Sequence, residues 1–428
     1  MQIKIKTLTP IWTGNINREC TKLRETSIIG SLRWWFEAIV RGFGGRACDP
    51  NLGKCEYNGN EKDVCAVCKL FGTTNWAKRF KFEINQSFSK IYGGNLVISG
   101  GGNKNWYYPS GLISCDGSTN KIEQILPCHI NEEKVETEPV LKVLLTFISK
   151  WGMMGGKTAI GYGVIRFEDE NGEVLRVNGD IDAFFSYLEQ KKKNGKNAEN
   201  APKLNEMFFA KFEVKENCIK NIFEKIEKSI SERDGKKQFP SAILKCNGIE
   251  ENINSAEDLL RRLKDCYGFI PSSALIRKEL RNILRNKGEV NKYSTFLKRV
   301  PDDAQDKFLT QLRHFLMGEL GRFSAIQISH IYWTGKNWEF RIWGWIPKNL
   351  DEILSSNPDK KSDITRDNLM IFIKNTLSDS EFWKNALGCS ISGIVEYPNN
   401  GWNFIDLGSV GDVEKVKEAF KEMVMKND

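Results

Sequence analysis

The sequence predicts an α+β protein built from two tandem ferredoxin-like domains (βαββαβ, as in RRM domains) with long insertions. In each half of the 428-residue chain, strand-like and helix-like segments alternate in the order β-α-β-β-α-β, which is the order of that fold. The polar stretch 189–203 separates the halves and contains almost no apolar side chain. The second half also repeats the organisation of the first with little identity, as duplication of one unit would produce.

We therefore expect an N-terminal domain at 1–188 with a Cys-rich insertion at 46–72, a linker at 189–203 and a C-terminal domain at 204–428. In the first domain, residues 3–10 alternate apolar and polar side chains like a half-buried strand. Residues 30–41 and 139–151 have helical apolar periodicity. In the second domain, a basic helix is expected to begin at Ser272 as the first helix does at Gly30. Helix QLRHFLMG (311–318) is expected to match 139–151, and 325–346 reads as a strand hairpin.

Positive charge is concentrated in two stretches. The chain has 63 Lys and Arg against 55 Asp and Glu, a net charge of +8. Residues 1–110 contain 16 basic and 8 acidic residues, and 261–299 contain 11 and 3. Charge concentrated in this way favours a polyanion as partner, with a solvated basic face as the alternative. Because no apolar run reaches about 18 residues and the N-terminus lacks a signal-peptide core, we expect a cytoplasmic protein without a membrane partner.

Basic side chains near the predicted helices are candidates for phosphate contacts. Some precede the first helix, others are expected on its exposed face, and WAKRFKF (76–82) interleaves aromatic and basic residues as single-strand binders do. The alternative for the helix arginines is a surface ladder that pairs with Glu37. The RNA-binding candidates are Arg18, Lys22, Arg24, Arg33, Arg41, Lys78, Arg79, Lys81, Arg277 and Arg281.

The glycine-rich loop 152–163 is a further candidate. A P-loop is excluded because Trp151 stands where its first glycine is required, and because the helix here precedes the loop. Gly155 and Gly156 could expose backbone amides to an anion, with Lys157 adding charge. The alternative is a tight helix-to-strand connection.

Four of the eleven cysteines are clustered in sequence. An odd count without an export signal indicates reduced thiols. Cys48, Cys55, Cys65 and Cys68 follow the spacing C-x6-C-x9-C-x2-C, and the polar residues between them could hardly build a core. These four residues predict one structural Zn²⁺. The alternative is that Cys65 and Cys68 pack in the domain while the other two stay free.

The sequence gives little support to catalysis, and we expect no enzyme and no cofactor required for activity. There are three histidines, none near the basic helix, and no G-x-S-x-G, H-E-x-x-H or paired-carboxylate pattern.

Several motifs carry a family resemblance. They are TPIWTG (9–14), IIGSLRWW (28–35), ACDP (47–50), CAVCKLFG (65–72) and GYG (161–163). In this order they resemble the RAMP superfamily of CRISPR-associated RNA-binding proteins, and more narrowly the first-subunit family of the type III-B (Cmr) effector complex. Trp34 and Trp35 depart from the small residues typical of sister RAMP proteins.

The resemblance implies two ferredoxin-like domains that bind guide RNA near its 3′ end, target RNA, or both, beside other Cmr subunits in antiviral defence. It implies that this subunit does not cut RNA. Two alternatives stay open, a guide-processing endoribonuclease of the same superfamily and a protein-only assembly module.

Overall fold

The computed structural model describes most of the chain from Met1 to Lys426. Outside the described residues lie 18, 50–52, 85–87, 93–95, 100–104, 109–110, 115–117, 125–136, 199, 231, 234–235, 238–241, 247–248, 254, 319–322, 351–353, 355–363 and 427–428. Among the described helices, none is both long enough and apolar enough to cross a membrane.

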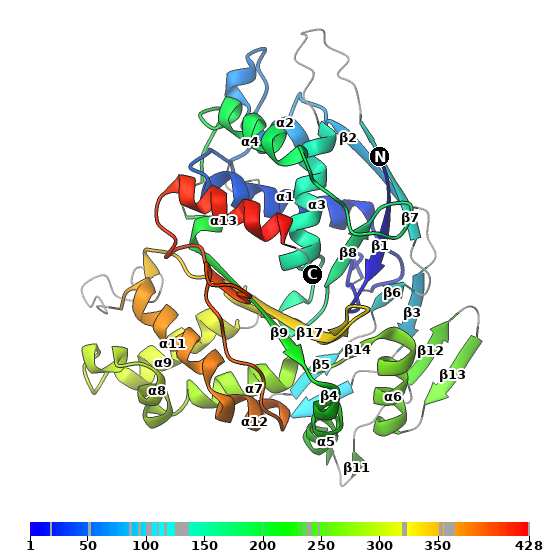
Figure 1. The fold of residues 1–428 in the computed structure, drawn as a ribbon, viewed down its shortest axis with the longest axis vertical. Coiled ribbons are helices and arrows are strands. Elements are labelled where there is room, and N and C mark those ends of the chain that lie inside the picture. The colour runs from blue at the N-terminus through cyan, green and yellow to red at the C-terminus, as the bar shows by residue number, and fades with distance from the viewer. Residues whose placement is uncertain are drawn as a thin grey trace.

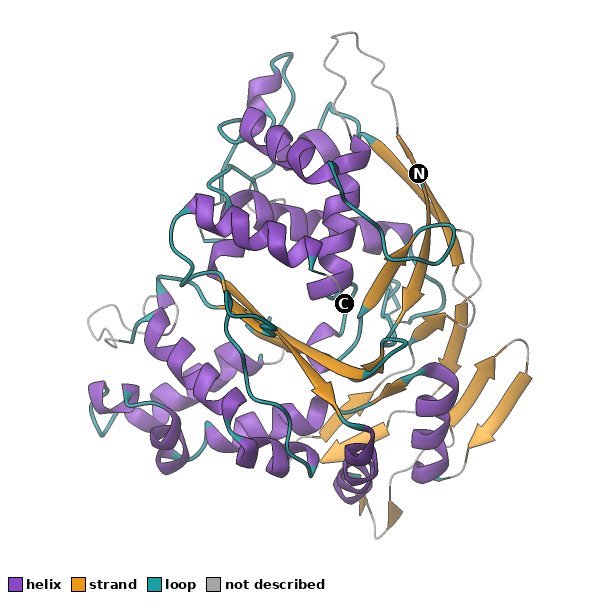
Figure 2. Ribbon diagram, in the orientation of Figure 1, coloured by secondary structure: helices purple, strands orange, loops and turns teal. Residues whose placement is uncertain are grey.

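The first half forms one ferredoxin-like sheet with two helices on one side (Figures 1 and 2). Helix α1 (Glu25–Gly42) connects the first two strands, and α3 (Thr137–Trp151) connects the last two. The sheet order is β2-β7-β1-β8, and all neighbours are antiparallel. These strands are β1 (Gln2–Thr7), β2 (Phe80–Ile84), β7 (Ser118–Gln124) and β8 (Ile165–Glu168). The predicted βαββαβ order is confirmed.

The apolar pattern of the sequence accounts for how these elements pack. Ile3 and Ile5 of β1 are buried and alternate with more exposed residues, as in a strand with one face on the core. In α1, Leu32, Trp35 and Phe36 form the predicted buried stripe. The helix begins at Glu25, five residues before the predicted start.

The second half repeats the same topology. Its sheet order is β14-β16-β17-β9-β18, with β15 also paired to β17 and all pairs antiparallel. Helices α7 (Ser273–Ile283) and α11 (Arg366–Ser378) lie where α1 and α3 lie in the first half. The strands are β9 (Met207–Val214), β14 (Phe269–Ile270), β15 (Ile326–Ile328), β16 (Ile331–Trp333), β17 (Trp338–Trp345) and β18 (Phe404–Asp406).

One predicted correspondence between the halves is wrong. The sequence matched QLRHFLMG to the helix at 139–151. That segment is the end of α9 (Gln305–Met317), which precedes β15 and so belongs to the first crossover. The counterpart of α3 is α11, because α11 connects β17 to β18. Similar glycines after the two helices produced the false match.

The other elements are insertions and additions to the two units. In the first half they are α2 (Ala66–Phe71), β3 (Phe88–Tyr92), β4 (Leu96–Ser99), β5 (Asn105–Tyr108), β6 (Leu112–Ser114) and α4 (Asp180–Lys191). In the second half they are α5 (Ile219–Ser229), β10 (Glu232–Arg233), β11 (Lys236–Lys237), β12 (Ala242–Cys246), β13 (Ile249–Ile253), α6 (Ala256–Tyr267), α8 (Lys287–Tyr293), α12 (Ser380–Leu387) and α13 (Val413–Met425).

The two halves are packed together. Helix α13, near the C-terminus, lies against α3 of the first half (Figure 1), and its Phe420 ring is 5.0 Å from that of Phe147. Arg341 of β17 is buried and donates to the carbonyl oxygens of Ser149 and Gly152 at 3.1 and 3.0 Å. Residues 192–198 are bonded to the first half, since the Arg46 amide donates to the Lys192 carbonyl at 2.8 Å. The division of the chain at 189–203 stays a prediction.

Candidate nucleic-acid interface and metal centre

Three segments that are distant in sequence meet at the start of α1. The hydroxyl of Thr13 donates to the Lys22 carbonyl at 2.8 Å and accepts from the Arg24 amide at 3.3 Å. The Gly156 amide donates to the Trp12 carbonyl at 2.8 Å. The Gly155 amide also donates to Ser31 Oγ of α1 at 3.0 Å. Backbone and side-chain hydrogen bonds therefore hold the loop before α1, the first turns of α1 and the glycine loop 152–163 together.

A groove of about 440 Å³ opens at this meeting point. We call it the α1 groove. It is lined by aromatic rings from both halves, by small residues of α1 and by the glycine loop. Its lining includes Trp12, Gly30, Trp34, Gly156, Phe323 and Trp343. The Phe323 side chain is 57% exposed, whereas Trp343 is 3% exposed.

Two side-chain donors at the groove have no acceptor among the described residues. One is the indole N–H of Trp343, which lines the groove, and the other is the Nε of Arg24 beside it. Buried donors are nearly always paired in folded proteins, but both nitrogens are enclosed by protein atoms, so neither is open to a ligand in the groove.

Sequence reasoning missed Phe323 and Trp343. Trp343 alternates with other apolar residues in a strand and looks like ordinary core. Phe323 follows Gly321-Arg322 in a segment that resembles a loop. The sequence signal for Phe323 was a large aromatic residue next to glycine and arginine, which alone is weak evidence for a binding site.

The glycine loop is a tight connection rather than an open amide cradle, so the prediction of free amides at Gly155 and Gly156 is wrong. The Gly155 amide donates to Ser31 Oγ at 3.0 Å, and the Gly156 amide is bonded to Trp12. Gly155 has φ +79° and Gly161 φ +104°. A Cβ at Gly161 would lie 2.4 Å from Nδ1 of His330, so only glycine fits there.

Cations nevertheless remain at the edge of the α1 groove. Lys157 is exposed, and its Nζ lies 5.5 Å from the centre of the Trp12 ring. Lys22 is also exposed, and Arg24 is half-buried. These predicted residues lie together at one end of the helix, although they come from two segments.

Arg33 and Arg41 do not lie on an exposed face as predicted. Arg33 donates to Glu37, to the Gly72 carbonyl at 3.0 Å and to the Cys68 thiol at 3.2 Å. Arg41 is 6% exposed and donates to the carbonyl oxygens of Ala47, Cys48 and Pro202. The Cys-rich insertion covers this face, so these guanidinium groups hold the insertion in place.

Arg277 and Arg281 of α7, which the sequence also predicts to contact phosphate, form hydrogen bonds within the chain. Arg277 is 1% exposed and bonds to the carbonyl oxygens of Met317 and Ile326. Arg281 donates to the Met317 carbonyl at 3.2 Å. Burial, with a smaller contribution from Arg285 and Arg313, lowers the pKa of Arg281 to about 10.

The remaining basic candidates lie apart from the α1 groove. Lys78 and Arg79 are half-buried, and the Arg79 guanidinium lies 4.6 Å from the centre of the Trp76 ring. Lys81 is exposed and forms an ion pair with Glu83. Arg18 lies outside the described residues.

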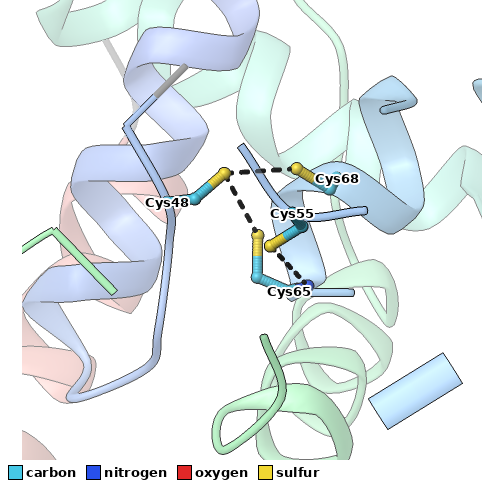
Figure 3. A group of neighbouring side chains, drawn as sticks. All are labelled: Cys48, Cys55, Cys65 and Cys68. Carbon is cyan, nitrogen blue, oxygen red and sulfur yellow. Dashed lines mark hydrogen bonds between the residues drawn. The ribbon is translucent and has the colours of Figure 1, made fainter. Parts of the chain in front are cut away.

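The four clustered cysteines come together as predicted from their spacing (Figure 3). Their ligand atoms all lie within 4.8 Å of one another, and all four residues are buried. The sulfur of Cys48 lies 3.3 Å from that of Cys68 and 4.0 Å from that of Cys65. In a tetrahedral site with Zn–S bonds of about 2.3 Å, neighbouring sulfurs are about 3.8 Å apart. The thiols therefore have the donor type and spacing that a structural zinc requires.

The thiols perturb one another strongly. Hydrogen bonds with Cys48, and then with Cys65 and Cys68, hold the pKa of Cys55 below its ordinary value. Hydrogen bonds with Cys48 and Cys55 raise the pKa of the Cys65 and Cys68 thiols. Four thiolates could share so small a space only with a counter-charge, which a metal ion would supply.

Neighbouring chain segments enclose the cysteine cluster. Gly195 packs against Cys65 so closely that a Cβ on the glycine would lie 2.3 Å from the Cys65 nitrogen. The Gly195 amide donates to the Lys62 carbonyl at 2.9 Å, and the Ala198 amide donates to the Ala47 carbonyl at 3.0 Å. Part of the predicted linker therefore covers the cluster.

The histidine that lies between the halves is buried. His330 packs against Gly161 and Tyr162, and burial lowers its pKa to about 3. The Ser273 amide donates to its Nδ1 at 3.4 Å. An enclosed, neutral imidazole is poorly placed for acid–base chemistry on a bound RNA. His129 lies outside the described residues.

Comparison with known families gives one match. Residues 4–168 match the model of the RAMP superfamily. This stretch contains the first ferredoxin-like unit except the first two residues of β1, together with the predicted motifs. No curated protein matches the chain.

Two solved structures are weakly similar over most of the chain. The crystal structure of apo Cmr1 from Pyrococcus furiosus is 14% identical, covers 87% of this chain and 95% of its own, and has a TM-score of 0.36. A cryo-EM structure of type III-B Cmr-beta bound to cognate target RNA is 13% identical, with coverages of 81% and 94% and a TM-score of 0.32. Likenesses this weak carry no argument about activity.

Proposed function

We propose that this protein is a non-catalytic RNA-binding subunit of a type III-B CRISPR (Cmr) effector, because residues 4–168 match the model of the RAMP superfamily. It would bind guide RNA near its 3′ end, target RNA, or both, beside other Cmr subunits in the cytoplasm. The RAMP match indicates the superfamily, and the motifs TPIWTG and GSLRWW favour the narrower assignment.

The single observation that carries RNA binding is the exposed Lys157, whose Nζ lies 5.5 Å from the centre of the Trp12 ring at the edge of the α1 groove. Lys22 and Arg24 lie close to it in the loop before α1, since their backbone atoms are hydrogen-bonded to Thr13 of the groove lining. Positive side chains on a surface with exposed aromatic rings are suited to a single-stranded polyanion. Because phosphate contacts dominate such binding, recognition would depend little on sequence and strongly on salt.

The test is binding of the full chain to a labelled single-stranded RNA of guide length across a salt series. Lys157→Ala should weaken binding to every RNA sequence and flatten the salt dependence by about one counterion. The matched control is Lys384→Ala, which removes an exposed lysine on α12. Equal effects of the two variants would remove Lys157 from the site. A discrete cleavage product without divalent metal would instead indicate an endoribonuclease.

We also propose that Cys48, Cys55, Cys65 and Cys68 hold one structural Zn²⁺. A bound zinc would supply four metal–thiolate bonds where the polar insertion cannot build a core. Purified protein should contain one zinc per chain, and Cys68→Ser should lose it. A metal-free wild-type chain that unfolds at the same temperature with and without added zinc would contradict this role.

A further inference from the structure

We propose that the α1 groove binds one unpaired nucleobase of the RNA, stacked among rings from both halves of the chain. This inference rests on the proposed RNA-binding function and adds to it a base pocket separate from the phosphate contacts. Two observations support it: the arrangement of the aromatic rings and the charges around the groove.

The rings are held in place before any ligand arrives. Trp34 lies edge-on to Trp35, with 4.9 Å between centroids and 88° between planes. Its ring is 5.7 Å from Trp343 and 6.4 Å from Phe323. Phe323 is the most exposed of these rings, at 57%. An exposed aromatic ring beside rigid partners costs little conformational entropy on stacking, and every base offers a flat π-face.

Trp343 packs behind the more exposed rings. Its ring lies 4.8 Å from that of Trp35, and the residue is 3% exposed. Its indole nitrogen is buried, so Trp343 contributes the face or edge of a ring to the groove lining and no hydrogen bond to a ligand. A flat, unsaturated ring is the ligand group that such a lining suits, and every nucleobase has one.

The charges around the α1 groove also favour a nucleobase with its flanking phosphates. None of the described residues that line the groove carries a carboxylate. Lys157, above the Trp12 ring, lies at its edge. A base in the groove would thus have its flanking phosphates close to a cation, as in other single-strand binders. Gly30 leaves open space at the groove wall, since no atom would lie within 4 Å of a Cβ there.

The experiment compares two probes of equal charge, an oligouridine and an abasic ribose-phosphate chain of the same length, on the full-length protein. The wild type should bind the oligouridine more tightly. Phe323→Ala should weaken oligouridine binding by about 5- to 100-fold and leave abasic binding and the salt slope unchanged.

Two controls separate stacking from folding. Phe323→Tyr should restore oligouridine binding, and Trp333→Ala, which truncates a half-exposed tryptophan outside the groove lining, should have no effect. Equal wild-type affinity for the two probes would overturn the base pocket but leave RNA binding intact. No binding of either probe at low salt would overturn both proposals.

Discussion

Helices α1 and α7 occupy the same place in the two halves, and each carries arginines on the face that the sequence predicted to be open. In the first half, the Cys-rich insertion covers this face, and Arg33 bonds to Cys68 and to the Gly72 carbonyl. In the second half, α9 covers it, and Arg277 bonds to carbonyl oxygens at the end of α9 and in β15. Each arginine fixes an insertion to the helix.

The arginine-bearing faces of α1 and α7 are both covered, but the N-terminal ends of the two helices differ in exposure. At α1, Gly30 is exposed and the α1 groove opens. At α7, Ser272 and Ser273 are fully buried, and the hydroxyl of Ser273 donates to the Ile328 carbonyl at 2.8 Å. The first half therefore has an open helix start and the second half has a closed one. The proposed RNA binding would use the open start of α1 rather than the arginine-bearing face of either helix.

The largest expected change in stability comes from a substitution in α7, the helix whose start is buried. Arg277→Ala should lower the free energy of unfolding by about 3 kcal/mol, because it leaves a cavity where the buried guanidinium lay and removes its charged hydrogen bonds to two backbone carbonyls. Chemical denaturation of the purified protein measures this change. Lys278→Ala, on the same helix but half-exposed, should change stability by less than about 0.5 kcal/mol. Similar values for the two variants would mean that Arg277 does not fix α9.

A pH dependence should come from His330, which joins the glycine loop to the second half. Burial lowers the pKa of His330 from 6.5 to about 3. Between pH 6.5 and pH 3, this side chain is therefore protonated in the unfolded chain and neutral in the folded chain. Its contribution to stability is present above pH 6.5 and is lost as the pH falls toward 3. Between pH 7 and 5 this loss is about 2 kcal/mol.

The measurement for His330 compares stability at pH 7 and pH 5 in two variants. His330→Gln should remove about 2 kcal/mol of the difference between the two pH values. His314→Gln, on α9, should leave that difference as in the wild type. If His330→Gln kept the full pH dependence, the proton uptake would belong to other groups.

The smallest expected effect is a change in zinc affinity when Arg33, beside the cysteine cluster, is substituted. Four thiolates around Zn²⁺ carry a net negative charge, and Arg33 lies 3.2 Å from Cys68 to offset it. Arg33→Gln should weaken zinc binding by about 10-fold, as removal of a partner of a metal ligand commonly does. Competition with a coloured chelator measures this, and Arg79→Gln is the control. Unchanged zinc affinity would show that Arg33 serves packing alone.

The sequence was sufficient for the fold because strand and helix periodicities are local. Ile3 and Ile5 alternate with polar residues, which predicts a strand, and Trp35 and Phe36 follow helical spacing, which predicts a helix. The structure has a strand and a helix at these places. The cysteine cluster was also predictable, since C-x2-C brings two thiols together. The exposure of Arg33, Arg41 and Arg277 was not predictable, because each is covered by a segment distant in sequence. The α1 groove was missed for the same reason, since Phe323 and Trp34 meet only in three dimensions.

The central claim is that RNA binds at the open start of α1 and not along its arginine-bearing face. Ultraviolet crosslinking of bound RNA, followed by mass spectrometry of the crosslinked peptides, tests it directly. We predict crosslinks in peptides that contain Trp12, Trp34 and Phe323. Crosslinks confined to peptides from α7 or from the Cys-rich insertion would contradict the account.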